Sequence, residues 1–203
     1  MSTSRENILG RVRAALAPLK ERAAHPVFDD KTATIPSLPT GNTTAFFKER
    51  LQLANGRAFD DAATLAAWLK SEGHLHGYCD PLLWPGLKSI FADGFKVETS
   101  FDRKRVDDYQ FGITRARGAI AETGSIVLQD ATTSSRLGAL APWVHIAVVS
   151  KENIFPDIAA ALAGLGEDPN NIWCTGPSKT ADVEGILIQG VHGPGVQIAL
   201  LEA

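Results

Sequence analysis

The C-terminal segment, residues 172–202, constrains the fold most, because three short apolar runs alternate there with dense clusters of glycine, proline and polar residues. The runs are Ile172–Cys174, Ile186–Ile188 and Val196–Leu201, and their branched residues are typical of strands. The last two runs flank the sequence Gly-Val-His-Gly-Pro-Gly, whose glycines and proline can hold a backbone that aims His192. Polar groups presented at strand ends are where α/β proteins keep their binding sites.

Length and composition predict one soluble domain without a membrane span. The chain has 203 residues, of which 44% are hydrophobic, and no apolar stretch approaches the roughly 18 residues of a transmembrane helix. The first residues are polar, so we expect a cytoplasmic protein. The net charge is −3 and the basic residues are scattered, so we expect no nucleic-acid partner.

Cysteine usage argues against a metal centre within the chain. Cys79 and Cys174 lie far apart and form no Cys-x-x-Cys pair, which excludes an iron–sulfur or structural zinc site of the usual spacing. His74 and His76 share one face of a predicted strand, but no third ligand can be assigned. We therefore predict two reduced thiols and no metal site.

Residues 1–42 differ in pattern from the rest of the chain. The spacing of apolar residues predicts an amphipathic helix over Ser4–Leu19, with Thr3 and Glu6 placed as a capping box. Proline-rich residues then predict an extended arm, which either clasps a partner subunit or straps across its own domain. Residues 43–203 are expected to form a single α/β domain.

Within that domain, helices and strands are predicted to alternate. Helices are expected over residues 43–55 and 62–72 and near residues 86–92 and 156–165. Such alternation predicts a mixed or parallel sheet flanked by helices. The further strand candidates are Leu75–Cys79, Phe95–Thr99, Phe111–Thr114, Ala119–Ala121, Ser125–Gln129 and Val144–Val149.

The first candidate site is the stretch Glu122-Thr123-Gly124 between two predicted strands. A carboxylate beside a glycine at a strand end can act as a base, a nucleophile or a hydrogen-bond acceptor. The alternative is a tight turn with Glu122 directed to solvent. Just before it, Arg115 and Arg117 offer the fork geometry that recognises carboxylate or phosphate, although solvation at the surface is the simpler explanation.

The second candidate site comprises polar residues after Gly176-Pro177. Hydroxyls, backbone amides and a lysine in a turn that opens a short helix could hold an anion. The alternative is a helix cap with acidic residues in the first turn. No Walker motif and no Gly-x-Gly-x-x-Gly motif is present. The residues concerned are Ser178, Lys179, Thr180, Asp182 and Glu184.

The third candidate is His192 itself. A histidine in such a loop could move protons, or in its neutral form hydrogen-bond a ligand carbonyl. The alternative is a structural loop histidine.

Three motifs stand out together, namely Ile120–Ser125, Thr175–Gly185 and Gly190–Pro194. In their order and spacing they resemble the lactate-utilisation protein C family of single-domain LUD proteins. The resemblance extends to residues 4–9 and 143–149, so it covers essentially the whole chain.

The resemblance implies a three-layer α/β sandwich with a mixed, mostly parallel sheet. This fold is similar to the ribose-phosphate isomerase, glucosamine-phosphate deaminase and CoA-transferase superfold. The resemblance also implies a role in bacterial oxidation of L-lactate to pyruvate beside two iron–sulfur partner proteins. The chain itself would carry no cofactor, and electrons would travel through the partners.

On this hypothesis, the polar loops converge on a small anionic substrate. Glu122 and His192 would be catalytic, with one of them taking the hydroxyl proton. Two alternatives stay open, namely an isomerase or transferase acting on sugar phosphates or CoA-linked substrates, and a non-catalytic assembly subunit. The substrate-binding residues would be Thr123, Gly124, Ser178, Lys179, Thr180, Asp182 and Glu184.

Overall fold

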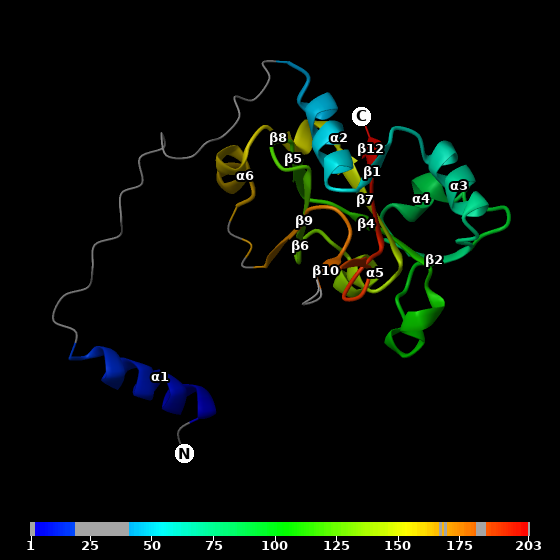
Figure 1. Ribbon diagram of the computed structural model, residues 1–203. Coiled ribbons are helices and arrows are strands. Elements are labelled where there is room, and N and C mark those ends of the chain that lie inside the picture. The colour runs from blue at the N-terminus through cyan, green and yellow to red at the C-terminus, as the bar shows by residue number, and fades with distance from the viewer. Residues whose placement is uncertain (1–2, 19–40, 167, 169, 182–185, 203) are drawn as a thin grey trace. The chain divides into compact units, whose positions relative to one another are not determined.

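The computed structural model describes residues 3–18, 41–166, 168, 170–181 and 186–202. The chain divides into two units, residues 1–36 and residues 37–203. Asp182 and Glu184 of the predicted site lie outside the described residues, as does most of the predicted arm. Figure 1 labels the elements in chain order.

The first unit contains helix α1 (Ser4–Leu16), which ends three residues before the predicted limit. The predicted capping box is present, since Glu6 N donates to Thr3 Oγ1 and Thr3 N donates to the Glu6 carboxylate. No side chain of α1 is buried, and Ile8, Val12 and Leu16 remain largely exposed.

The second unit is built on a six-stranded sheet in the order β1-β12-β7-β4-β2-β3. Every neighbouring pair in it is parallel, which confirms the predicted α/β class with a mostly parallel sheet. The strands are β1 (Arg57–Phe59), β2 (His76–Cys79), β3 (Lys96–Glu98), β4 (Phe111–Arg115), β7 (Val144–Ser150) and β12 (Val196–Glu202).

Helices α3 (Ala62–Ser71) and α4 (Trp84–Leu87) cover one face of this sheet (Figure 1). Asp61 begins α3 by accepting a hydrogen bond from Thr64 N, and the helix then buries Leu65 and Leu69. These side chains pack with the strand residues whose side chains point to the same face, among them Phe111 and Ile113. This apolar cluster is the first core of the domain.

A second, smaller sheet covers much of the other face, together with helices α2 (Thr43–Leu53) and α5 (Arg136–Leu140). Along β7, Ile146 and Val148 face the first core, whereas Ala147 and Val149 face the second. Helix α6 (Ile158–Gly164) packs on the outer face of the small sheet. That sheet has the order β8-β5-β6-β9, comprising β8 (Ile154–Phe155), β5 (Gly118–Ile120), β6 (Ser125–Gln129) and β9 (Asn171–Cys174).

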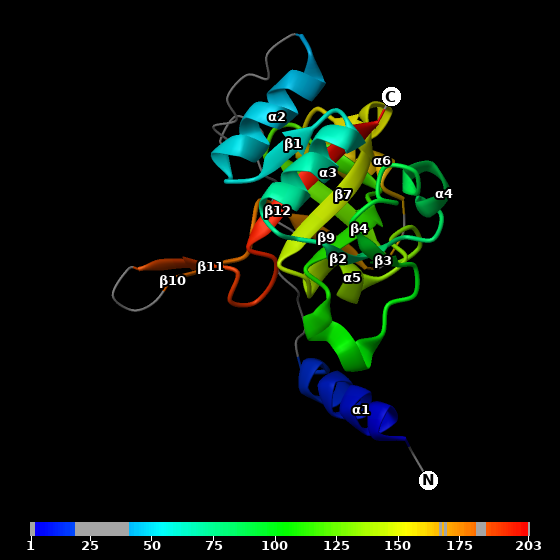
Figure 2. The same ribbon diagram turned by 90° about the vertical axis from the view of Figure 1, so that its right-hand side faces the viewer.

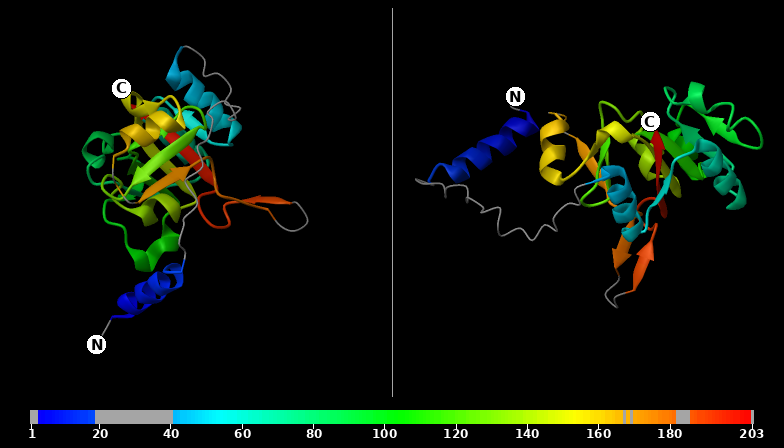
Figure 3. Two further views of the ribbon diagram at one scale, coloured as in Figure 1. Left: turned by 90° about the vertical axis from the view of Figure 1, so that its left-hand side faces the viewer. Right: turned by 90° about the horizontal axis from the view of Figure 1, so that it is seen from above.

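The remaining strands, β10 (Lys179–Ala181) and β11 (Leu187–Gln189), form a two-stranded antiparallel sheet that projects from the body in Figure 2 and Figure 3. The prediction that the Gly-Pro-Ser turn opens a short helix is wrong at this point, because β10 pairs with β11 directly after Ser178. Two 3₁₀ helices, Arg103–Asp108 and Lys151–Asn153, complete the described elements.

Candidate functional site

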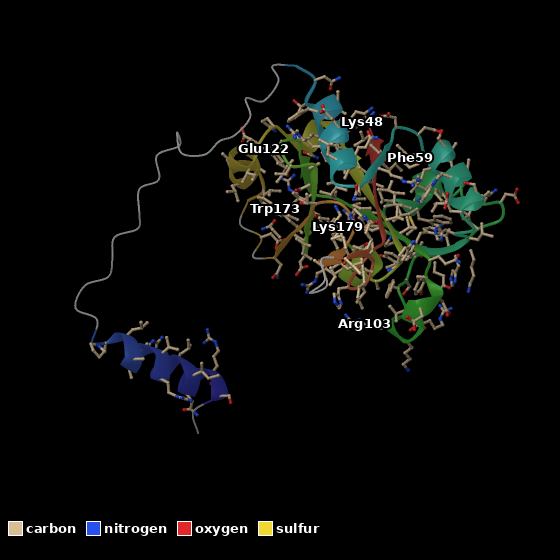
Figure 4. All side chains as sticks on the ribbon, viewed as in Figure 1. Lys48, Phe59, Arg103, Glu122, Trp173 and Lys179 are labelled. Carbon is tan, nitrogen blue, oxygen red and sulfur yellow. The ribbon has the colours of Figure 1, made fainter. Side chains whose placement is uncertain are left out.

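Glu122 lies in the turn after β5 and is engaged with a neighbouring helix. Its carboxylate accepts a hydrogen bond of 3.0 Å from the backbone N of Ile158, the first residue of α6, and its own N–H donates to Pro156 O. A negative charge at a helix N-terminus is favourable. Figure 4 places Glu122 beside α6, apart from Lys179, with Trp173 between them in that view. The recorded contacts of Glu122 do not include His192.

Thr123 and Gly124 complete this turn and pack it against α2. The Thr123 hydroxyl lies 2.6 Å from that of Ser125, which in turn lies 2.6 Å from the hydroxyl of Thr175. Gly124 has φ of 69°, and a Cβ at this position would lie 2.4 Å from the backbone N of Leu51. The glycine is therefore required by both its conformation and its close approach to α2.

Lys179 contacts the C-terminal end of the same helix. Its Nζ donates a hydrogen bond of 3.0 Å to Ala54 O, the cap residue of α2, where a positive charge complements the helix dipole. Close by, Gly176 has φ of 76°, and a Cβ there would lie 2.1 Å from the same carbonyl oxygen. Thr180 lies in β10 opposite Ile188. Lys179 and Gly176 thus hold the start of β10 against the C-terminal end of α2.

The structure does bring Ser178 to the His192 loop. Ser178 N donates to Pro194 O, and Gly190 N donates to Ser178 O, each at 2.9 Å. His192 is exposed, and no hydrogen-bond partner is recorded for its side chain among the described residues. Because this loop precedes β12, it lies at the amino edge of the parallel sheet.

A further candidate site lies at the carboxyl edge of the parallel sheet, opposite to the His192 loop. The strand order predicts its position. From β2 the chain moves outward to β3, then returns to β4 on the other side of β2 and continues through β7 to β12. The crevice outside the carboxyl ends of strands at such a reversal is the usual ligand position in open α/β sheets. Asp80 directly follows β2, and Arg115 ends β4.

Asp80 and Arg115 form an ion pair at this reversal. Arg115 Nε donates to Asp80 Oδ2 at 2.7 Å, and Asp80 is fully buried while a third of the Arg115 side chain remains exposed. The second carboxylate oxygen accepts from Leu82 N at 2.8 Å, and the Thr133 hydroxyl donates to Arg115 O at 3.0 Å. Neither Nη atom of Arg115 has a recorded acceptor in the described part of the chain. The guanidinium is thus held at Nε and keeps its terminal donors for a ligand.

A cavity of about 380 Å³ opens beside Arg115. Ser150 and Glu202 lie side by side at its rim, since the two residues are in register on β7 and β12. A space of this kind can bind a small carboxylate, because a guanidinium fork lies beside hydroxyl, amide and apolar groups. Arg117, Thr132, Asn153, Leu83 and Val148 also line it.

Arg115 and Arg117 were considered from the sequence as residues that could bind a carboxylate or phosphate, whereas Asp80 was not identified. The pairing joins residues 35 positions apart, so spacing alone does not reveal it. The usable signal was an aspartate placed directly after an apolar strand. Arg117 is anchored at the rim through a hydrogen bond of 2.9 Å from Nη2 to Gly164 O.

Both cysteines lie in environments that disfavour the thiolate. Burial, followed by the charge of Asp80, raises the pKa of Cys79 to about 12. Burial raises the pKa of Cys174 to about 11. Within the described ranges, no group of three or more His, Cys, Asp or Glu side chains is placed to hold a metal ion.

Residues 64–201 match the LUD domain. The chain belongs to the LUD domain family. This match includes Asp80 and Arg115 of the crevice as well as the loops of Glu122 and His192. Every helix in the described parts of this LUD-domain chain falls short of the length and apolarity needed to cross a bilayer.

Several curated proteins named lactate utilization protein C are similar to this chain. That of Bacillus licheniformis is 34% identical over 99 residues, covering 45% of this chain and 41% of the relative. That of Exiguobacterium sp. is 42% identical over 91 residues, covering 41% and 40%. The protein from Deinococcus radiodurans is 31% identical over 111 residues, covering 52% of each. The matched segments thus span about half the length of these relatives or less.

A solved structure supports the fold. The crystal structure of a DUF162 family protein from Deinococcus radiodurans superposes with a TM-score of 0.56 at 22% identity. The match covers 81% of this chain and 100% of the other. At this identity the similarity establishes the architecture alone.

Proposed function

We propose that this chain is the LUD-domain component of a bacterial lactate-utilisation system, in which L-lactate is oxidised to pyruvate together with two iron–sulfur partner proteins in the cytoplasm. The relatives named lactate utilization protein C support the lactate connection. In this proposal the chain binds the small carboxylate, and electrons leave through the partners.

The observation that carries the binding role is the Arg115 guanidinium, held at Nε by buried Asp80 with both Nη atoms available. Lactate and pyruvate each present a carboxylate that a guanidinium can bind through two parallel hydrogen bonds. The lactate hydroxyl would face the polar rim at Ser150 and Glu202, and its methyl group would lie toward Val148. We therefore place the substrate at the carboxyl edge.

Oxidation of lactate removes two electrons and two protons, one proton from the hydroxyl group and one from Cα, and the Cα hydrogen would leave with the electrons to the partner proteins. In the crevice, the Glu202 carboxylate is the acidic group nearest in register to Ser150 and would accept that proton. The alternative proton acceptors are His192 and Glu122, which were expected from the sequence and do not line this cavity.

Calorimetric titration of the full chain with L-lactate and with pyruvate tests the binding role. The informative variant is Asp80→Asn combined with Arg115→Met, because it removes both charges and leaves no unpaired buried carboxylate. We expect at least a tenfold loss of affinity, corresponding to about 1.4 kcal/mol. The control variant Lys88→Met removes a positive charge from the exposed surface. It should bind lactate and pyruvate with the affinity of the unaltered chain.

Lactate-dependent growth of a strain that carries the double variant tests the cellular role. Growth should fail with the double variant and persist with Lys88→Met. Normal growth and unchanged affinity in the folded double variant would contradict the proposed site. Oxidation of lactate by the isolated chain, without partner proteins, would contradict the proposed division of labour.

A phosphorylated or CoA-linked substrate is the second candidate, favoured by a neighbouring cavity of about 520 Å³. Arg103 and Arg136 line it together with Thr133, Ser134 and Ser135. Asp130 also lines it, and its carboxylate lies 3.1 Å from Arg136 Nε. Arginine and hydroxyl donors are the groups that bind phosphate oxygens. Titration with a sugar phosphate and with CoA distinguishes this candidate, because Arg103→Met should weaken their binding and leave lactate binding unchanged.

A further inference from the structure

The hairpin of β10 and β11 is a separate structural feature of the domain. Its strands hydrogen-bond to each other and to neither of the two larger sheets in the described chain. Figure 2 and both views in Figure 3 show it extending away from the body. The outer edge of β11 therefore carries backbone N–H and C=O groups without a partner strand.

The base of this hairpin is firmly held. Ser178 and Gly190 are hydrogen-bonded to each other, and Ser178 is also bonded to Pro194. Gly190 and Gly195 lie so close to the Trp143 ring that a Cβ at either position would lie 2.3 Å from it. These contacts fix the direction in which the strands leave the domain.

Large apolar side chains are exposed along the hairpin and at its base. The exposed fractions are 58% for Ile186, 56% for Leu187, 47% for Ile188, 52% for Val191 and 47% for Trp143. Successive residues of a strand point to opposite faces, so Leu187 and Ile188 expose apolar surface on both faces of the hairpin. An isolated two-stranded hairpin is only marginally stable in water, and pairing with further strands stabilises it.

The outer strand also lacks the usual protection of a free edge. Natural edge strands carry charged residues, proline or a bulge that oppose pairing, whereas β11 reads Leu-Ile-Gln. In the described part of the hairpin strands β10 and β11, the one charged residue is Lys179 on β10. Its ammonium group is hydrogen-bonded to Ala54 O. The edge of β11 is therefore open to another neutral, apolar strand.

We propose that a second copy of this chain occupies this edge, with β11 pairing antiparallel to its counterpart around a two-fold axis at Ile188. The two hairpins then form a continuous four-stranded sheet. Ile188 faces Ile188 of the other copy, and Leu187 faces Gln189, so no like charges are opposed. A neutral strand with apolar residues on both faces is self-complementary, as a closed two-fold interface requires.

The size of the apolar surface sets the strength of this dimer. The five exposed side chains each leave about half of their surface uncovered, which amounts to roughly 400 Å² per copy. Burial of all of this surface in both copies would remove about 800 Å² from solvent, below the roughly 1,200 Å² of a stable specific interface, so the dimer should be weak and depend on concentration.

Sedimentation equilibrium of the full chain over a range of concentrations tests the proposal. We expect the mass to rise from one toward two copies as concentration increases. Ile188→Lys places like charges opposite each other and should stay monomeric. Leu162→Lys on α6 and Ile8→Lys on α1 replace other exposed apolar residues and should dimerise as the unaltered chain does. A mass of one copy at every concentration, or a dimer lost only in Ile8→Lys, would refute the proposal.

Disulfide trapping tests the register. Directly opposed residues of paired antiparallel strands have Cβ atoms about 4.5–5.5 Å apart, near the reach of a disulfide bond. Ile188→Cys should therefore form a covalent dimer under mild oxidation. Leu162→Cys serves as the control and should not, and the native cysteines are buried or half-buried with raised pKa values. A covalent dimer from Leu162→Cys but not from Ile188→Cys would overturn the register. Neither test depends on lactate.

Discussion

The two edges of the parallel sheet use their polar residues differently. At the amino edge, the Lys179 ammonium group donates to Ala54 O of α2, and Ser178 is held to the neighbouring loop through its backbone N–H and C=O groups. At the carboxyl edge, Arg115 is fixed by one buried carboxylate and keeps both terminal nitrogens available beside a cavity. A cluster of polar residues in the sequence is therefore a weaker sign of a binding site than one charged side chain that is held firmly and only partly used.

The largest expected effect lies at the carboxyl edge. Arg115→Met leaves the fully buried Asp80 without its partner and should lower the free energy of unfolding by about 3–5 kcal/mol. Urea unfolding measures this loss. Adding Asp80→Asn should recover much of the stability, because the uncompensated charge is removed. A single-variant loss below about 1 kcal/mol would mean that the pair is no stronger than a surface ion pair.

A buried histidine near the amino ends of β7 and β12 should give the next largest effect. His145 is fully buried between Thr114 and Gln197, with hydrogen bonds of 2.9 Å and 3.1 Å. Burial lowers its pKa to about 4, against an ordinary value of 6.5. The unfolded chain therefore binds a proton in this interval that the folded chain does not. The stabilising contribution is complete above pH 6.5 and is lost as the pH falls toward 4, by about 3 kcal/mol at most.

Urea unfolding at several pH values checks the His145 prediction. His145→Gln removes the titrating group, so its stability should change less between pH 6.5 and pH 4 than that of the unaltered chain. Carboxylates titrate in the lower part of this interval in both proteins, and the difference between the two profiles isolates His145. Parallel profiles would contradict the prediction.

A smaller loss of stability is expected where Gly176 packs against α2. Gly176→Ala places a Cβ at 2.1 Å from Ala54 O at a positive φ of 76°, and should cost about 2–3 kcal/mol. Gly73→Ala is the matched control, since Gly73 has a φ of 77° and open space around it, and should cost about 1 kcal/mol. Thermal unfolding of both variants measures the difference. Equal costs would show that the contact with α2 is unimportant.

The smallest stability effects concern Glu122 and His192. His192→Ala should change the free energy of unfolding by less than about 0.5 kcal/mol, because the side chain is exposed. Glu122→Gln weakens the charge interaction with the N-terminus of α6 and should cost at most about 1 kcal/mol. Lactate-dependent growth then decides their role. Loss of growth with a folded variant would show that these loops contain the functional site. Normal growth would show that the altered residue is not part of that site.

Local patterns predicted most strands of the two larger sheets. Strands β6, β7 and β12 contain apolar runs bounded by turn residues, and the structure places their limits within one residue of those expected. Strands β1 and β8 were missed, because three and two residues carry too little periodicity to reveal a strand. β10 was mistaken for the start of a helix, since polar residues after a proline are common to caps and turns.

The sequence by itself determined the α/β class, the capping box of α1 and membership of the LUD domain family, because propensity, spacing and motifs are properties of neighbouring residues. Only the tertiary structure decided that Glu122 contacts α6, that Lys179 contacts α2 and that Asp80 pairs with Arg115. Each of these contacts joins residues at least 35 positions apart. The strand order that brings them together depends on how the whole set of apolar faces packs, and this is not encoded in any one segment.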